Sequence, residues 1–119
     1  METSEKQLQD NVDHIADELT NPPELDQEYI DNYLDSEYYE PGDTLSAYDY
    51  LQDALDIQYI VSRNKEYLGA RVLVAFGGPN IWINTQTETV EGYWWSDSAF
   101  ASFRDNLGLD DALEDLYNC

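Results

Sequence analysis

The chain has 119 residues and a net charge of −21, from 26 acidic against five basic side chains. This length fits one domain with a single modest core, and a hydrophobic content of 42% indicates a packed domain rather than a disordered chain. So anionic a surface disfavours nucleic acid, anionic membranes and acidic substrates as direct ligands, and it favours a basic protein or multivalent cations as partners.

The sequence gives no sign of a membrane or secretory segment. No stretch is apolar and long enough to cross a bilayer, and the polar start METSEKQLQDNVD does not resemble a signal peptide. The one cysteine, Cys119, is the last residue, so no internal disulfide can form, which fits a reducing compartment. We therefore expect a cytoplasmic protein.

The first 20 residues predict a helix. Apolar side chains recur there at helical spacing, namely Leu8, Val12, Ile15, Ala16 and Leu19. Two prolines, Pro22 and Pro23, separate this segment from the rest. We expect one domain over residues 1–119, with residues 1–20 as a loosely attached N-terminal helix.

Two further helices are predicted before the middle of the chain. Pro22-Pro23-Glu24 indicates the start of a helix over residues 25–34. Pro41-Gly42 then breaks the chain, and Asp43 or Thr44 is expected to cap the next helix.

Residues 57–95 predict β-structure. Four segments are rich in β-branched and aromatic residues: IQYIVSR, YLGARVLVAF, NIWIN and VEGYWW. The turn-like sequences NKE, GGP and TQTET separate them. Connections this short join antiparallel neighbours, so we expect an antiparallel meander of about four strands.

The C-terminal segment predicts helices again. Phe100, Phe103 and Leu107 have helical spacing and indicate a helix over residues 96–107, and a last short helix is expected over residues 110–117. Helices, then sheet, then helices make an α+β domain, with acidic helices on both sides of the sheet in sequence.

The pair Trp94-Trp95 admits two interpretations. Neighbouring residues of a strand point to opposite faces, so at least one indole is expected in the core. The other is a candidate for an exposed anchor.

Catalytic chemistry is poorly supported, and we expect no enzyme. His14 is the only histidine and lies in an acidic segment, so a surface histidine is preferred over a nucleophilic site with Cys119. The acidic clusters do not follow the calcium-loop pattern, so neither a metal site nor a cofactor is expected. GGPN at residues 77–80 lacks the lysine and helix of a phosphate-binding loop, which favours a turn.

The charge is segregated along the chain. Residues 1–56 hold 17 acids and one base, whereas residues 57–96 hold three of each. The segment DNYLDSEYYEPGD, residues 31–43, mixes carboxylates and tyrosines without a base. On helices, acids four residues apart, such as Asp31 and Asp35, share a face, and two or three packed acidic helices would approach the charge density of duplex DNA. A solvated acidic face and adaptation to high salt are the alternatives; the segregation favours a basic partner.

In being short, strongly acidic and tyrosine-bearing, with carboxylates on expected helices, the chain resembles small DNA-mimic inhibitors of host defence from phages and conjugative elements. These are antirestriction and anti-CRISPR proteins. GGPNIWINTQTETVEGYWW and LEDLYNC, within residues 77–119, also resemble short proteins carried on mobile elements of gut bacteria, with no activity implied. The class resemblance implies an inhibitor in the bacterial host cell that occupies the nucleic-acid channel of a nuclease or CRISPR effector.

Our leading hypothesis is therefore a non-enzymatic inhibitor that binds the basic nucleic-acid groove of a bacterial protein. The residues expected to contact this partner are Asp31, Asp35, Glu37, Tyr38, Tyr39, Glu40, Asp43, Asp49 and Asp53. The alternative is an acidic adaptor or antitoxin-like regulatory protein that binds a basic partner without mimicking nucleic acid. A small enzyme with carboxylate chemistry is a third and weaker hypothesis.

Overall fold

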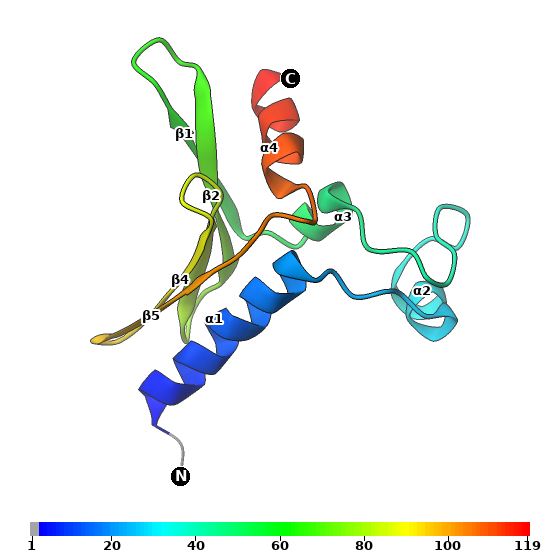
Figure 1. Cartoon of the computed structure of the whole chain (residues 1–119), viewed down its shortest axis with the longest axis horizontal. Coiled ribbons are helices and arrows are strands. Elements are labelled where there is room, and N and C mark those ends of the chain that lie inside the picture. The colour runs from blue at the N-terminus through cyan, green and yellow to red at the C-terminus, as the bar shows by residue number, and fades with distance from the viewer. Residues whose placement is uncertain (1–2) are drawn as a thin grey trace.

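The computed structural model describes residues 3–119 and shows an α+β fold (Figure 1). Its helices are α1 (Ser4–Thr20), α2 (Gln27–Tyr33), α3 (Ala47–Leu51) and α4 (Leu109–Asn118). Its strands are β1 (Asp56–Val61), β2 (Tyr67–Ala75), β3 (Asn80–Asn84), β4 (Thr89–Trp94) and β5 (Asp97–Ser102). The strands form one antiparallel sheet in chain order. The predicted fold class is confirmed, with five strands in place of about four.

The fifth strand overturns the helix that we expected over residues 96–107. Residues 95 and 96 make a two-residue turn, and β5 then pairs with β4 along its length, from Trp94↔Asp97 to Thr89↔Ser102. Alternate side chains of this segment, such as Ala99 and Phe103, enter the core. A strand period of two therefore replaces the helical spacing that the aromatic residues suggested.

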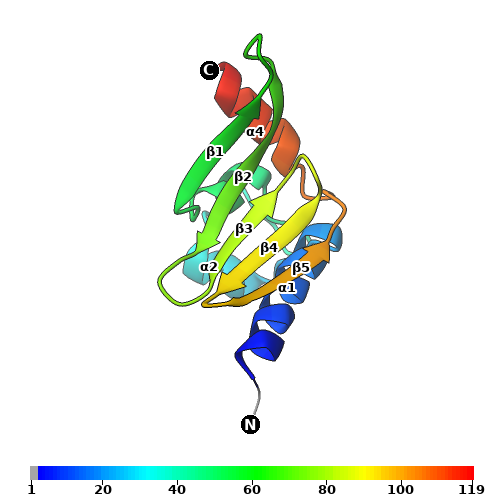
Figure 2. The ribbon, with the colours of Figure 1, turned by 90° about the vertical axis from the view of Figure 1, so that its left-hand side faces the viewer.

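All helices lie on one face of the sheet and leave the other face uncovered (Figure 2). α1 packs across β4 and β5, α4 packs on β2, and α3 contacts α4. The core between these layers consists mainly of the following buried residues: Leu8, Val12, Leu19, Ala70, Val72, Ile81, Ile83, Val90, Ala99, Phe103, Leu109 and Leu113. No helix within residues 3–119 combines the length and apolar character needed to cross a bilayer.

α1, which we expected to be loosely attached, lies directly on the sheet. Leu8, Val12 and Leu19 are fully buried. The helix approaches so closely because Gly92 of β4 has no side chain: a Cβ there would meet Val12 Cγ1 at 2.7 Å and Leu8 Cδ1 at 2.8 Å. Contact of the Val12 and Leu8 side chains with the backbone of Gly92 sets the distance between α1 and the sheet.

The uncovered face of the sheet carries an ion pair in an aromatic setting. The Arg71 guanidinium lies 4.3 Å from the centre of the Trp82 ring and donates to Glu91 Oε1 at 3.1 Å. Glu91 also accepts hydrogen bonds from Asn84 Nδ2 at 3.1 Å and from the Tyr93 hydroxyl at 2.9 Å. The charges of Arg71 and Glu91 are thus matched to each other on this face.

Candidate partner-binding surface

Residues 22–46 leave the body of the molecule and return to it, and we call this excursion the anionic lobe. At its base, Leu25 N donates to Asp43 O at 2.7 Å and Gly42 N donates to Leu25 O at 2.9 Å. A bridge between Glu24 and Thr44 closes the same ladder. α2 lies in the outer part of the lobe, well away from the sheet (Figure 1). The two chain segments at the base of the lobe are thus paired with each other.

The lobe contains less helix than the sequence predicts. α2 has seven residues, begins after the N-cap Asp26, whose side chain accepts from Tyr29 N, and ends where Leu34 adopts an extended conformation. The fully buried Ile30 anchors α2 within the lobe. Asp35 therefore lies beyond the helix, and the expectation that Asp31 and Asp35 share a helical face is wrong.

α3 is also short, with five residues. Its N-cap is Ser46, whose Oγ accepts from Asp49 N at 3.1 Å, rather than Asp43 or Thr44. Asp53 lies in the turn that follows. The acids of residues 24–56 are thus spread over two short helices, loops and the start of β1, and they do not form the packed acidic helices that we expected.

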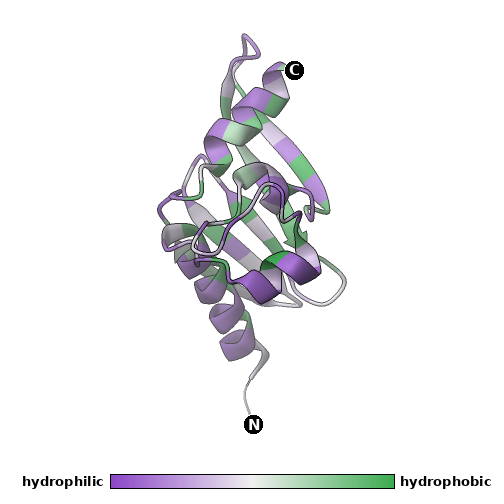
Figure 3. Cartoon of the chain, turned by 90° about the vertical axis from the view of Figure 1, so that its right-hand side faces the viewer, coloured by the Kyte–Doolittle hydropathy of each residue, from purple (hydrophilic) through white to green (hydrophobic). Residues whose placement is uncertain are grey.

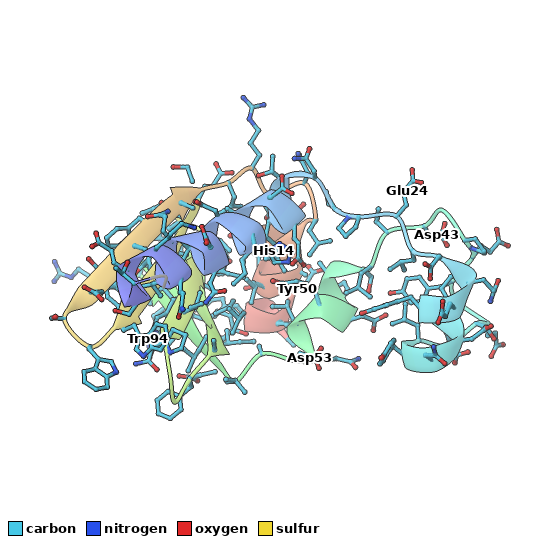
Figure 4. All side chains as sticks on the ribbon, turned by 90° about the horizontal axis from the view of Figure 1, so that it is seen from below. His14, Glu24, Asp43, Tyr50, Asp53 and Trp94 are labelled. Atoms are coloured by element: carbon cyan, nitrogen blue, oxygen red, sulfur yellow. The ribbon has the colours of Figure 1, made fainter. Side chains whose placement is uncertain are left out.

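The structure nevertheless gathers the predicted contact residues in one region. Seven of them belong to the lobe: Asp31, Asp35, Glu37, Tyr38, Tyr39, Glu40 and Asp43. Asp49 lies on the adjoining α3 and Asp53 directly after it. Figure 4 shows Asp53 and Tyr50 in the part of the body beside the lobe, while Glu24 and Asp43 lie in the lobe.

The lobe carries acids without compensating bases. Its eight acidic side chains are all exposed, namely Glu24, Asp26, Glu28, Asp31, Asp35, Glu37, Glu40 and Asp43. It contains no lysine, arginine or histidine. The ion pairs among residues 3–119 are Lys6–Asp10, His14–Glu18 and Arg71–Glu91, and none of them reaches the lobe. In Figure 3, where the lobe faces the viewer, the outer sides of α1 and α2 are mainly hydrophilic.

Some carboxylates of the lobe also order its backbone. Asp35 Oδ1 accepts from Glu37 N at 2.9 Å, and Asp43 Oδ2 accepts from Glu40 N at 2.9 Å. Asp31 Oδ1 accepts from Gln27 Nε2 at 2.7 Å. These donors are neutral, so the negative charge remains while the loop is held in shape.

A cavity lies between the lobe and α3. Its volume is about 780 Å³, and its lining includes four tyrosines (Tyr29, Tyr33, Tyr38 and Tyr39) and three acids (Asp35, Asp49 and Asp53). The Tyr39 hydroxyl joins the two walls, because it donates to Asp49 Oδ2 and accepts from Ser46 N at 3.1 Å. Five of the nine predicted contact residues line this cavity; Asp31, Glu37, Glu40 and Asp43 do not.

The structure does not bring together His14 and Cys119, the residues considered for a nucleophilic site. His14 is exposed on α1 beside Glu18, with Nε2 2.6 Å from Oε1, whereas Cys119 is exposed at the end of α4. Within residues 3–119, no group of three or more histidine, cysteine or acidic side chains is placed to hold a metal ion.

Sequence reasoning missed two features of this surface. Tyr29 and Tyr33 are not among the expected contact residues, yet they line the cavity, and their ring centres lie 5.0 Å apart. The sequence did not distinguish the two indoles: the Trp95 side chain is 95% exposed, whereas Trp94 packs against the core. The density of tyrosine over residues 29–39 was the available signal for the cavity.

Comparison with known proteins adds no relative: no protein-family model, no curated protein and no solved structure matches the chain significantly. Its function therefore has to be argued from the anionic lobe and the cavity beside it.

Proposed function

We propose that the chain is a non-enzymatic inhibitor that occupies the basic nucleic-acid-binding groove of a bacterial defence nuclease or CRISPR effector by mimicking a polyanion. The observation that carries this proposal is the anionic lobe, which projects from the body with eight exposed acids and no base. A projecting, uncompensated anionic element is the electrostatic complement of a groove that binds phosphates.

The physical basis is electrostatic competition. A groove lined by lysine and arginine attracts polyanions over distances limited by the ionic strength. A chain with a net charge of −21 and a duplex repel each other, so both cannot occupy one groove. Because α2 has only seven residues, the mimicry rests on the projection and charge of the lobe and not on phosphate-like spacing along a helix.

The proposed contact residues take different roles. Asp31, Glu37 and Glu40 are exposed, do not line the cavity and present charge outward. Tyr38 is exposed and is available to pack against the partner, as tyrosines do at interfaces. Tyr39 is half-buried and hydrogen-bonded to Asp49, so it supports the loop that carries the other contacts.

A capture experiment with DNA competition tests the proposal. The chain is immobilised, exposed to bacterial lysate and washed with duplex DNA. We expect a nucleic-acid-binding protein to be retained and then released by the duplex. A partner that stays bound in excess DNA would contradict mimicry and favour the adaptor alternative.

A charge-matched pair of variants locates the interface. The lobe variant carries Glu28→Gln, Asp31→Asn, Glu37→Gln and Glu40→Gln. The control carries Glu5→Gln, Glu66→Gln, Asp111→Asn and Glu114→Gln, which are exposed acids outside the lobe. Both should fold at least as well as the parent, since surface changes are usually worth within about 0.5 kcal/mol. Only the lobe variant should associate slowly with the partner. Equal loss in both would mean that net charge, and not the lobe, determines binding.

A further inference from the structure

The cavity between the lobe and α3 has the size of a ligand site. Its volume of about 780 Å³ falls within the roughly 300–1,000 Å³ that small-molecule sites occupy in proteins. One wall belongs to the lobe and the other to α3 and the turn after it. Its polar groups lie on both walls, so a side chain that entered would be contacted from two sides.

Aromatic rings form much of the lobe wall. Tyr29 and Tyr33 stand on successive turns of α2, with ring centres 5.0 Å apart and planes tilted by 43°. Tyr38 follows on the loop. The side chains of Tyr33 and Tyr38 are 73% and 76% exposed. Tyrosine rings attract cations through their π-faces, and these rings are accessible to one.

The carboxylates of the cavity keep free acceptor positions. Asp53 makes no side-chain hydrogen bond within residues 3–119, and Asp35 uses one oxygen for Glu37 N. Asp49 is engaged at both oxygens, by the Tyr39 hydroxyl and by Gln52 Nε2 at 3.4 Å. No lysine or arginine occurs between Lys6 and Arg63, and His14 does not line the cavity, so the segment that forms the cavity brings no permanent cation of its own.

We propose that this cavity binds an arginine side chain of the partner protein. A guanidinium is planar, stacks on aromatic faces and is weakly hydrated, whereas an ammonium is compact and strongly hydrated. The flat face of the guanidinium can stack on the tyrosines, while its N–H groups donate to Asp35 and Asp53. Rings and carboxylates together therefore select arginine over lysine.

The source of this arginine rests on the proposed function. Grooves that bind nucleic acid present arginine to phosphates, and a lobe inserted in such a groove brings its flanking cavity to the same residues. The ligand chemistry rests instead on the cavity alone, so it can be tested without the partner.

The test is an NMR titration of the ¹⁵N-labelled chain with three capped tripeptides, Gly-Arg-Gly, Gly-Lys-Gly and Gly-citrulline-Gly. Citrulline has nearly the shape of arginine but no charge. We expect saturable shifts with the arginine peptide, confined to residues that line the cavity, several-fold weaker binding of the lysine peptide and none of the citrulline peptide. Equal binding of lysine and arginine would show that charge alone acts and would overturn the proposal, as would shifts spread over the acids of α1.

Two double variants distinguish the contribution of the tyrosine rings to peptide binding from that of their hydroxyl groups. Tyr33→Leu with Tyr38→Leu removes two exposed rings and should raise the dissociation constant of the arginine peptide at least tenfold. Tyr33→Phe with Tyr38→Phe keeps the rings and should bind within about twofold of the parent. Unchanged binding by the leucine variant would overturn the site.

Failure here is distinguishable from failure of the proposed function. The acids changed in the lobe variant above do not line the cavity. An arginine peptide that binds a chain without any DNA-competing partner would leave the cavity site standing and remove the inhibitor role. If a DNA-competing partner were found but the arginine peptide did not bind, the inhibitor role would stand and the cavity site would be overturned.

Discussion

At the scale of single residues, Trp95 is one of three non-glycine residues with a positive φ among residues 3–119, beside Lys65 and Glu88. It is the first residue of the turn between β4 and β5 and has a φ of 59°, whereas Ser96 has a negative φ. This is the pattern of a type II′ turn, which favours glycine at its first position. A side chain in the left-handed region places Cβ too close to the following carbonyl, at a cost of roughly 1–2 kcal/mol.

Trp95→Gly should therefore stabilise the fold. The indole is 95% exposed, so its removal loses little packing, and the Cβ strain is relieved. We expect the free energy of unfolding to rise by about 1 kcal/mol in urea denaturation. Trp95→Ala is the matched control: it removes the indole but keeps Cβ, so it should show no comparable gain. Equal stability of the two variants would mean that the turn is not strained by its side chain.

At the scale of secondary-structure elements, the attachment of α1 depends on one glycine. Gly92 lies under Val12 and Leu8, and a methyl group there would overlap both. Gly92→Ala should force α1 outward and destabilise the fold by about 1–3 kcal/mol, the usual cost of overpacking a core.

The control is Gly78→Ala in the turn between β2 and β3. A Cβ at Gly78 meets no atom within 4 Å, and Gly78 does not have a positive φ. Its denaturation midpoint should stay near that of the parent. If both variants were equally stable, α1 would not be packed on β4 as described.

α4 is held to the sheet partly by tyrosine. The Tyr67 hydroxyl donates to Asp110 Oδ1 at 2.7 Å, and the Tyr117 hydroxyl donates to Lys65 O at 2.7 Å. Burial, and secondarily the hydrogen bond to Asp110, raises the pKa of Tyr67 above its ordinary value near 10. Burial, with Glu18 nearby, raises the pKa of Tyr50 to about 12.

These shifts predict alkaline destabilisation with a definite sign. A raised pKa means that the folded state favours neutral tyrosine, so this stability is complete below about pH 10 and falls as the pH rises toward the folded pKa. Tyr67→Phe should cost about 1 kcal/mol at neutral pH through the lost hydrogen bond and should lose less stability than the parent above about pH 10. Tyr38→Phe, on an exposed ring, should follow the parent; identical pH curves for all three would contradict this role.

Prediction from sequence succeeded where local composition determines the element. β-branched and aromatic runs between glycine and proline turns specify β1 to β4. It failed at β5, whose sequence DSAFAS contains two serines and two alanines. That strand is stabilised by its ladder with β4 and by α1 above it, and both are tertiary contacts that a single segment does not reveal.

At the scale of the whole molecule, the sequence located the acids but not their arrangement. Charge runs evenly through residues 1–56, so nothing in the composition separates α1, which packs on the sheet, from the lobe, which projects. The cavity requires Tyr29, Tyr38 and Asp53 to meet across the base of the lobe. Their meeting depends on the backbone ladder between Leu25 and Asp43, which joins residues that no helical or strand period relates.

The uncompensated charge of the lobe predicts how stability responds to salt. Raising the ionic strength from about 0.01 M to 0.15 M shortens the screening length from about 30 Å to about 8 Å, which weakens repulsion among exposed carboxylates. The free energy of unfolding should therefore rise over this range, and partner association should slow over the same range because its attraction is screened too. The measurement is urea denaturation at each salt concentration, with association rates recorded in parallel.

The lobe variant described above supplies the comparison, since it removes four of the eight acids of the lobe. Its stability should gain less from salt than that of the parent, because less repulsion remains to be screened. The control variant lacks four acids that are dispersed over α1, the turn between β1 and β2, and α4, so it should keep most of the gain. If the parent showed no gain at all, its carboxylates would already be compensated. The lobe would then not be the unpaired anionic surface on which the proposed inhibition depends.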